Sequence, residues 1–172
     1  MIRKILLGVA TLLIVLVLGA GIYTWDPLPK NPSVEVLAAA AADYDVEIIR
    51  ANWGTPHIYG KTNADTAFGA AYAHAEDDFE TIQDVVAATR GVLARYKGAS
   101  AAPTDYVVAL RDVWGVIERR YETDVPAEIK AIADAYAAGI NLYAAENPDE
   151  TWAGLVPFTG QDVIAGFVLQ TP

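Results

Sequence analysis

The chain of 172 residues contains no cysteine, only two serines and only two histidines. Without cysteine, it offers no thiol nucleophile, no disulfide framework and no usual structural zinc site. Neither Ser33 nor Ser100 lies in a Gly-x-Ser-x-Gly turn, the setting that exposes the serine nucleophile of many hydrolases. No complete active site is therefore visible in this sequence.

Basic residues are scarce as well. All 22 acidic residues and ten of the 12 basic residues follow Trp25, so this part of the chain has a formal net charge of −12. A surface with that much negative charge repels phosphate backbones. The composition therefore argues against nucleic acid as a partner.

One long hydrophobic run lies near the start of the chain. Residues 5–22 carry no charge, are long enough for a helix to cross a bilayer, and follow Arg3 and Lys4. This pattern predicts an N-terminus inside the cell and an exported remainder, either anchored in the inner membrane or secreted. Residues 1–25 are interpreted as an uncleaved anchor or as a signal segment, because residues 19–21 are small enough for a cleavage site.

The next segment, residues 26–44, is interpreted as a linker followed by a short helix. Three prolines between residues 27 and 32 exclude a helix there and predict an extended spacer. An alanine run at residues 38–42 predicts the short helix. Residues 45–50 then alternate polar and apolar side chains, Gly54 and Pro56 predict a turn, and residues 57–59 can return as a second strand.

From residue 64 onward the apolar spacing predicts helices. The first runs from about residue 64 to Gly91 or Gly98, the second over residues 104–122, the third to residue 145, and the last follows residue 159.

Polar residues predict where these helices begin. Thr62 or Asn63 can cap the first helix, Asp124 can cap the third, and Thr159 begins a capping-box signal. The last helix has no capping glycine or basic final turn, which predicts that the sequence continues in a longer polypeptide.

Two motifs carry a resemblance. Residues 50–60 read Arg-Ala-Asn-Trp-Gly-Thr-Pro-His-Ile-Tyr-Gly, and residues 68–78 read Phe-Gly-Ala-Ala-Tyr-Ala-His-Ala-Glu-Asp-Asp. In order and spacing they resemble the start of the α chain in the penicillin acylase family, and residues 89–98 and 136–141 extend the resemblance. The structural signature that this resemblance marks is Arg50, Gly54, Pro56, His57, Gly69, Tyr72, Asp77 and Gly91. Departures from the family pattern fall at Ala51, Ala71, Glu76 and Asp78.

The resemblance implies an α+β fold, mainly helical in this portion, whose helices pack on the αββα core of an N-terminal nucleophile hydrolase. Members are made as one precursor that cuts itself into an α chain and a larger β chain. The first residue of the β chain, usually serine, is the nucleophile, and its free α-amino group can act as the base. Residues 45–172 then form an incomplete α-chain portion, with the β chain as partner and the nucleophile beyond Pro172.

The resemblance also implies a small-molecule substrate, a linear acyl amide, and residues 89–98 look closest to the acyl-homoserine lactone and aculeacin acylase branch. It carries over no catalytic residue, metal ligand or cofactor onto this chain, and the substrate-binding residues stay unknown. The alternative function is a membrane-anchored, acidic helical binding protein without catalysis. The sequence after Pro172 would distinguish the two.

Three local patterns have competing interpretations. His74 and Glu76 have the His-x-Glu spacing of zinc deaminases, but the cysteines of that site are missing. The acidic residues between positions 76 and 84 could bind a hard cation, yet a solvated helix face is the preferred interpretation. We expect His57 to be hydrogen-bonded inside the fold, and Asp77 to be a buried ion-pair or cap partner.

Overall fold

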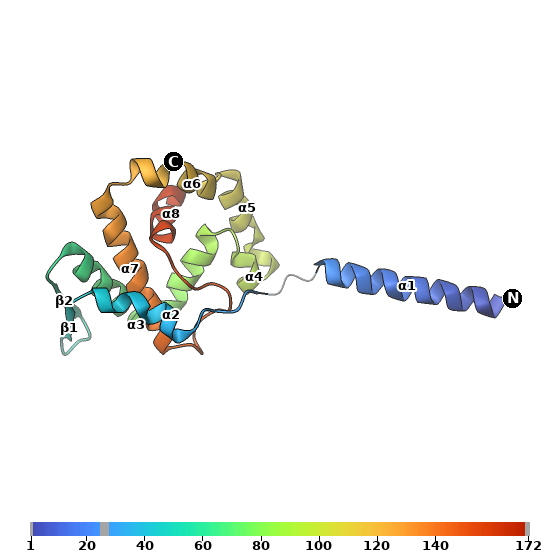
Figure 1. Cartoon of the computed structure of the whole chain (residues 1–172), viewed down its shortest axis with the longest axis horizontal. Helices are drawn as coiled ribbons and strands as arrows, with labels where there is room; N and C mark the ends of the chain where they lie inside the picture. Colours follow the sequence, from blue (N-terminus) through green and yellow to red (C-terminus); the bar gives the residue numbers. More distant parts are fainter. Residues whose placement is uncertain (1, 25–27, 171–172) are drawn as a thin grey trace.

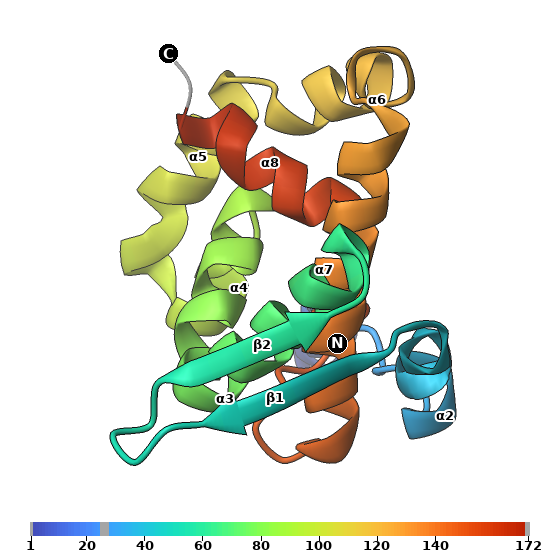
Figure 2. The same ribbon diagram turned by 90° about the vertical axis from the view of Figure 1, so that its left-hand side faces the viewer.

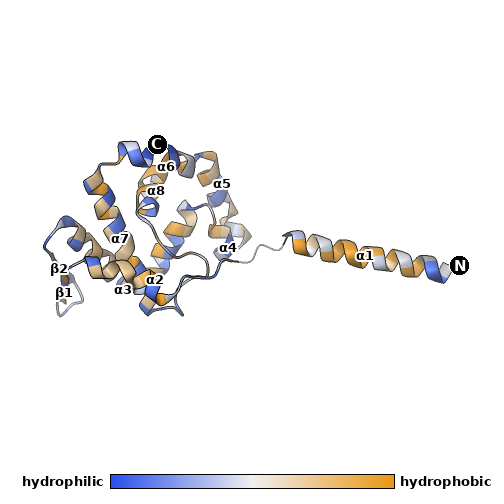
Figure 3. Ribbon diagram, in the orientation of Figure 1, coloured by the Kyte–Doolittle hydropathy of each residue, from blue (hydrophilic) through white to orange (hydrophobic). Residues whose placement is uncertain are grey.

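The computed structural model describes residues 2–24 and 28–170, so part of the predicted spacer lies outside the described residues. Helix α1, Ile2–Thr24, contains an 18-residue stretch, Leu6–Tyr23, that is long and apolar enough to cross a membrane. Figure 3 shows it as the most continuously hydrophobic element of the chain. This agrees with the predicted span, and it fits an anchor and a signal segment equally well.

A short helix and a hairpin follow the linker. Helix α2, Val34–Ala38, continues into a 3₁₀ turn, η1, Ala39–Asp43, as the alanine run predicted. Strands β1, Val46–Arg50, and β2, Pro56–Gly60, pair antiparallel with Ile48 opposite Ile58. Gly54 makes the turn in the left-handed region, at φ 84°. The predicted strand pair is confirmed.

The hairpin covers α3 with one face and leaves the other face open (Figure 2). Val46 and Ile58 lie against Gly69 of α3 so closely that a Cβ at this glycine would come within 2.8 Å of both side chains. His57 alternates with Ile58 and is therefore exposed on the opposite face, where no side-chain hydrogen bond involves it among the described residues. The expectation that His57 is hydrogen-bonded inside the fold was wrong for this chain.

The remaining elements are helices. In chain order they are α3, Asn63–Thr89; α4, Leu93–Lys97; the 3₁₀ turn η2, Ala99–Ala101; α5, Ala102–Leu110; α6, Val113–Asp124; α7, Ala127–Glu146; and α8, Gly160–Gln170. Figure 1 shows α3 and α7 side by side, with α4 and α5 on the side of the body away from the hairpin and α6 and α8 along its upper part. Gly91 follows the C-cap of α3 at φ 67°, and Gly98 ends α4.

The single helix predicted for residues 104–122 is two helices. Asp112, at φ 51°, separates α5 from α6. Along a straight helix Val108 and Val113 would point about 140° apart, whereas the break lets both pack in one buried cluster with Ile117 and Ala165. Burial of these side chains therefore overrides the helical continuation.

The predicted caps are partly confirmed. Thr62 and Asp65 form a reciprocal capping box at the start of α3, and Thr159 and Asp162 exchange the same bonds at α8. Asp124, predicted to cap the third helix, instead ends α6, and the N-cap of α7 is Pro126.

Helices α3 and α7 form the centre of the core. Alanines on both helices are buried between them, including Ala71, Ala75 and Ala144. At the closest crossing, a Cβ on Gly139 of α7 would collide with the backbone carbonyl of Phe68 in α3. Small residues are required because the two backbones approach so closely, and this contact fixes α3 and α7 as the walls of the groove described below.

Candidate functional site

Arg50 joins the hairpin to α3. Its guanidinium pairs with Glu76 at 2.7 Å and with Asp77 at 2.9 Å, and it also donates to the carbonyls of Gly54 and Ala73. The hydrogen bond to Glu76 is the main cause that raises the pKa of Arg50. Asp77 is thus an ion-pair partner as expected, but its side chain is 55% exposed, so the expectation that it is buried was wrong.

The signature residues fall into separate groups. Arg50, Gly54, Pro56 and Asp77 lie in or against the hairpin, where Pro56 is opposite Arg50 in the strand register. Gly91 lies at the far end of α3, against Val108 and the backbone of Asp105. These positions shape the backbone and do not converge on one reactive centre.

Tyr72, also in the signature, links α3 to α7. Its hydroxyl donates to Glu146 at 2.7 Å, and its ring lies edge-on to Tyr143 at 6.0 Å. Partial burial, followed by the hydrogen bond to Glu146, raises the pKa of Tyr72 to about 12. The phenol is therefore neutral at ordinary pH and acts as a donor between the helices.

The acidic cluster on α3 divides between two cations. Glu76 and Asp77 pair with Arg50, whereas Glu80 and Asp84 pair with Lys97 at 2.9 and 3.1 Å. The change of partner coincides with a kink at Asp78, where φ is −157° and ψ is 60°. In the part of the chain that the structure describes, no group of three His, Asp or Glu side chains could hold a metal ion.

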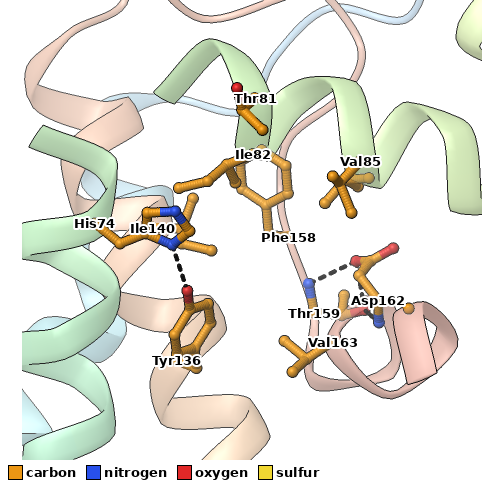
Figure 4. A pocket seen from close by; sticks show the side chains of 12 residues that line it. His74, Thr81, Ile82, Val85, Tyr136, Ile140, Phe158, Thr159, Asp162 and Val163 are labelled. Atoms are coloured by element: carbon orange, nitrogen blue, oxygen red, sulfur yellow. Dashed lines mark hydrogen bonds between the residues drawn. The ribbon is translucent and has the colours of Figure 1, made fainter. Parts of the chain in front are cut away.

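An apolar groove lies between α3, α7 and α8. It consists of a cavity of about 160 Å³ at Ile82, Val85 and Phe158 and a wider hollow of about 680 Å³ toward Ile129 and Phe167. The two share four lining residues: His74, Tyr136, Val163 and Gly166. Figure 4 shows the smaller cavity from close by, with side chains of all three helices pointing into it.

The polar pair at the mouth of the groove is His74 and Tyr136. The Nδ1 atom of His74 lies 2.7 Å from the hydroxyl of Tyr136, as Figure 4 shows, and burial raises the pKa of this tyrosine. Sequence reasoning missed the pair because 62 positions separate the two residues. The apolar spacing predicted a helix that runs to residue 145, but nothing in that pattern located a partner for His74.

Beneath the groove, Arg90 and Asp162 form a buried ion pair. Arg90 Nε and Nη2 each lie 2.7 Å from a carboxylate oxygen of Asp162, whose side chain is 2% exposed. The guanidinium also donates to the carbonyls of Leu155 and Pro157 at 2.6 and 2.9 Å. One side chain thus fixes the end of α3, the loop before α8 and the capping box of α8.

Loop residues 147–159 are held by two further polar side chains. Asn141 exchanges both of its amide hydrogen bonds with the backbone of Phe158 at 2.8 Å. Gln83 accepts from the backbone of Trp152 and donates to the carbonyl of Glu150. Because these bonds replace backbone partners that a loop cannot supply, the wall of the groove that contains Phe158 is rigidly placed.

The site offers positioning without a reactive nucleophile. Ser33 precedes α2 and Ser100 lies in η2, and no hydrogen bond joins either hydroxyl to a histidine within residues 28–170. The groove can therefore bind apolar matter and present a histidine and a phenol, but nucleophilic catalysis needs a further group.

The residues that form the clamp and the groove match a known protein family. Residues 45–168, most of the part beyond the linker, match the penicillin amidase family model. The chain belongs to the penicillin amidase family. It is 31% identical over 119 residues to the penicillin acylase 2 proenzyme of Pseudomonas sp. strain SE83, and 30% identical over 130 residues to the acyl-homoserine lactone acylase QuiP of Pseudomonas putida.

These alignments cover 69% and 76% of this chain but only 15% and 16% of the relatives, so the chain spans about a sixth of their length. A solved structure, thermostable penicillin G acylase from Alcaligenes faecalis, shares the fold with a TM-score of 0.61 at 21% identity. That alignment covers 72% of this chain and 70% of the solved chain. In this chain the Arg50 clamp and the groove both lie within the residues that match the family model.

Proposed function

We propose that this chain is the N-terminal and α-chain portion of an exported amidohydrolase precursor, tethered to the membrane by residues 5–22. The complete enzyme cleaves a linear amide to a carboxylic acid and an amine. The observation that carries the proposal is the family match over residues 45–168, in alignments that cover only about a sixth of the relatives' length.

A separate β chain would supply the chemistry. Its first residue, usually serine in this family, attacks the amide carbonyl, and its own α-amino group takes the proton of the hydroxyl. The amine then leaves with a proton, and water hydrolyses the acyl ester to release the acid. Neither serine is hydrogen-bonded to a histidine within residues 28–170, which supports a division of labour in which this chain positions the substrate and the β chain reacts.

Two surfaces of this chain suit such a partner. The open face of the hairpin exposes Ile49 and Tyr59, with Trp53 at the turn 96% exposed, and the apolar groove leaves Phe167 65% exposed. Apolar surface of this extent on a folded body marks an interaction site. The structural alignment covers 72% of this chain and 70% of the solved penicillin G acylase chain, so the two chains are similar in length. Both are much shorter than the penicillin acylase 2 proenzyme, of which the sequence alignment covers only 15%. This difference in length supports a two-chain enzyme.

The substrate proposed is a fatty-acyl amide of the acyl-homoserine lactone type. Relatives named for acyl-homoserine lactones and for penicillin both match at about 30% identity, so the comparison alone favours neither. The preference rests on residues 89–98, which resemble the acyl-homoserine lactone and aculeacin acylase branch.

Mass spectrometry of the purified precursor tests the proposal. We expect two chains, a free serine-like residue at the start of the second, and hydrolysis of an acyl-homoserine lactone faster than of a penicillin. Replacing that first residue with alanine is the matched control and should abolish hydrolysis. A single uncut chain that hydrolyses no amide would favour the acidic binding protein instead.

Export is tested separately. A reporter enzyme that works only outside the cytoplasm, fused after Pro32, should be active. Activity from a cytoplasmic reporter alone would contradict the proposed location.

A further inference from the structure

The linker after the membrane helix is docked on the folded body. Asn31 accepts a 2.7 Å hydrogen bond from the backbone N–H of Gly154, and this glycine adopts φ 75°. A Cβ at Gly154 would lie 2.6 Å from Cδ of Pro29 and 2.9 Å from its carbonyl oxygen. The chain therefore passes directly over the loop before α8, so close that only glycine fits beneath it.

This docking makes the tether short. Helix α1 ends at Thr24, and Pro29 already contacts the body. Five residue steps span at most about 18 Å even when fully extended. If α1 lies in a bilayer, Pro29 cannot be farther than that from the end of the span, and the loop at Gly154 lies directly against Pro29. A spacer that makes no contact with the folded body would leave that body free to rotate relative to the membrane. This linker contacts the body, and it therefore fixes which side of the body is near the lipid.

The side of the body next to the docked linker carries residue types that are common at membrane interfaces. Trp152 stacks on Tyr96 with ring centroids 4.7 Å apart, and Lys97 Nζ lies 5.0 Å above the Trp152 ring. The hydroxyl of Tyr96 donates to the carbonyl of Ala153, beside the docked linker. Tryptophan, tyrosine and lysine are the residues enriched where a protein meets the headgroup region of a bilayer.

Charges of the two signs nearly balance on this face. Lys30, Arg95 and Lys97 lie on it together with the exposed Asp149 and Glu150, and Lys97 pairs with Glu80 and Asp84 of α3. The residues after Trp25 together carry −12, so most other surfaces would be repelled by anionic lipid. The hairpin lies at the opposite end of the body from the docked linker, as Figure 1 shows.

We propose that the face formed by the docked linker, α4 and loop residues 147–157 rests against the phospholipid bilayer that holds α1, with Trp152 and Tyr96 in the interface. This proposal rests on the anchor in the proposed function. It leaves the hairpin, at the opposite end of the body, directed away from the lipid and open to the rest of the enzyme.

Single labels can test the orientation, because this chain has no cysteine of its own. The complete precursor, with any cysteine outside this chain changed to serine, is placed in phosphatidylcholine nanodiscs that contain a nickel-chelating lipid. A spin label is attached at Ala153→Cys beside the linker or, as the matched control, at Asn52→Cys in the exposed hairpin turn. We expect nickel-induced relaxation of the label at position 153 and none at position 52.

A second variant separates docking from anchoring. Inserting about 20 Gly-Ser residues after Pro27 adds a coil that spans roughly 25 Å, and Asn31→Ala removes the acceptor for Gly154. Together they should abolish the relaxation at position 153 while the precursor stays in the disc.

Three results would overturn the proposal. Equal relaxation at both positions, or stronger relaxation at position 52, would contradict the assigned face although the anchor holds. Relaxation at position 153 that survives the insertion would show that docking does not set the orientation. A precursor that loses residues 1–25 and leaves the disc would refute the anchor itself, and this proposal with it.

Discussion

Removing the carboxylate of Asp162 should open one wall of the groove. The side chain is 2% exposed and binds Arg90 through both oxygens, while also accepting from the backbone and hydroxyl of Thr159. Breaking a buried ion pair by deleting one partner costs about 3 to 5 kcal/mol. Arg90 is 23% exposed and keeps its hydrogen bonds to the carbonyls of Leu155 and Pro157. We therefore expect the free energy of unfolding to fall by the lower end of this range, about 3 kcal/mol.

Hydrogen exchange of the complete precursor measures this cost locally. A loss of about 3 kcal/mol in Asp162→Ala corresponds to exchange roughly a hundredfold faster. We expect that acceleration in the backbone amides of residues 155–165, with the hairpin amides unchanged.

The matched control is Asp124→Ala, which removes an exposed i,i+4 partner of Arg120. Such an exposed pair contributes little to stability, so exchange in α6 should rise by no more than about twofold. Acceleration below threefold in Asp162→Ala, or no greater than in the control, would refute the role given to the buried pair.

Three further changes test other contacts. Arg50→Ala should speed exchange in the hairpin about tenfold or more, because charged hydrogen bonds contribute about 1.5 to 3 kcal/mol; unchanged exchange would contradict the clamp. Gly139→Ala forces a Cβ against the carbonyl of Phe68, so thermal unfolding should show that the free energy of unfolding falls by about 1 to 3 kcal/mol. Stability equal to that of the wild type would show that α3 and α7 can move apart to accept the methyl group. Folding raises the pKa of the Tyr72 phenol, so its contact with Glu146 should stabilise the fold fully below pH 10 and less as the pH rises toward 12. The absorbance of the phenolate measures this titration. A rise in that absorbance near pH 10, as in an unfolded chain, would contradict the prediction.

Local sequence signals predicted much of this fold. The alternation at residues 45–50 and the turn at Gly54 located the hairpin, and Thr62 located the start of α3, because these features depend on neighbouring residues alone. The break at Asp112 could not be read in this way. It depends on how side chains of α5 and side chains of α6 pack together against α8, and this tertiary contact is not encoded in the local sequence.

The candidate site was less predictable. Asp162 was recognised as part of a capping signal, but its pairing with Arg90 joins positions 72 apart, and no local pattern contains that contact. His57 was given a buried partner because its motif suggested a fixed turn. Strand alternation placed its neighbour Ile58 against α3 instead, so His57 faces the open side where the proposed β chain would pack.

The central claim is that this chain positions the substrate while a second chain carries the reaction. It is tested most directly by assaying residues 26–172 and the complete precursor side by side for hydrolysis of an acyl-homoserine lactone. We expect turnover by the processed precursor and none by residues 26–172, because neither serine is hydrogen-bonded to a histidine within residues 28–170. Hydrolysis by residues 26–172 alone would contradict the two-chain enzyme.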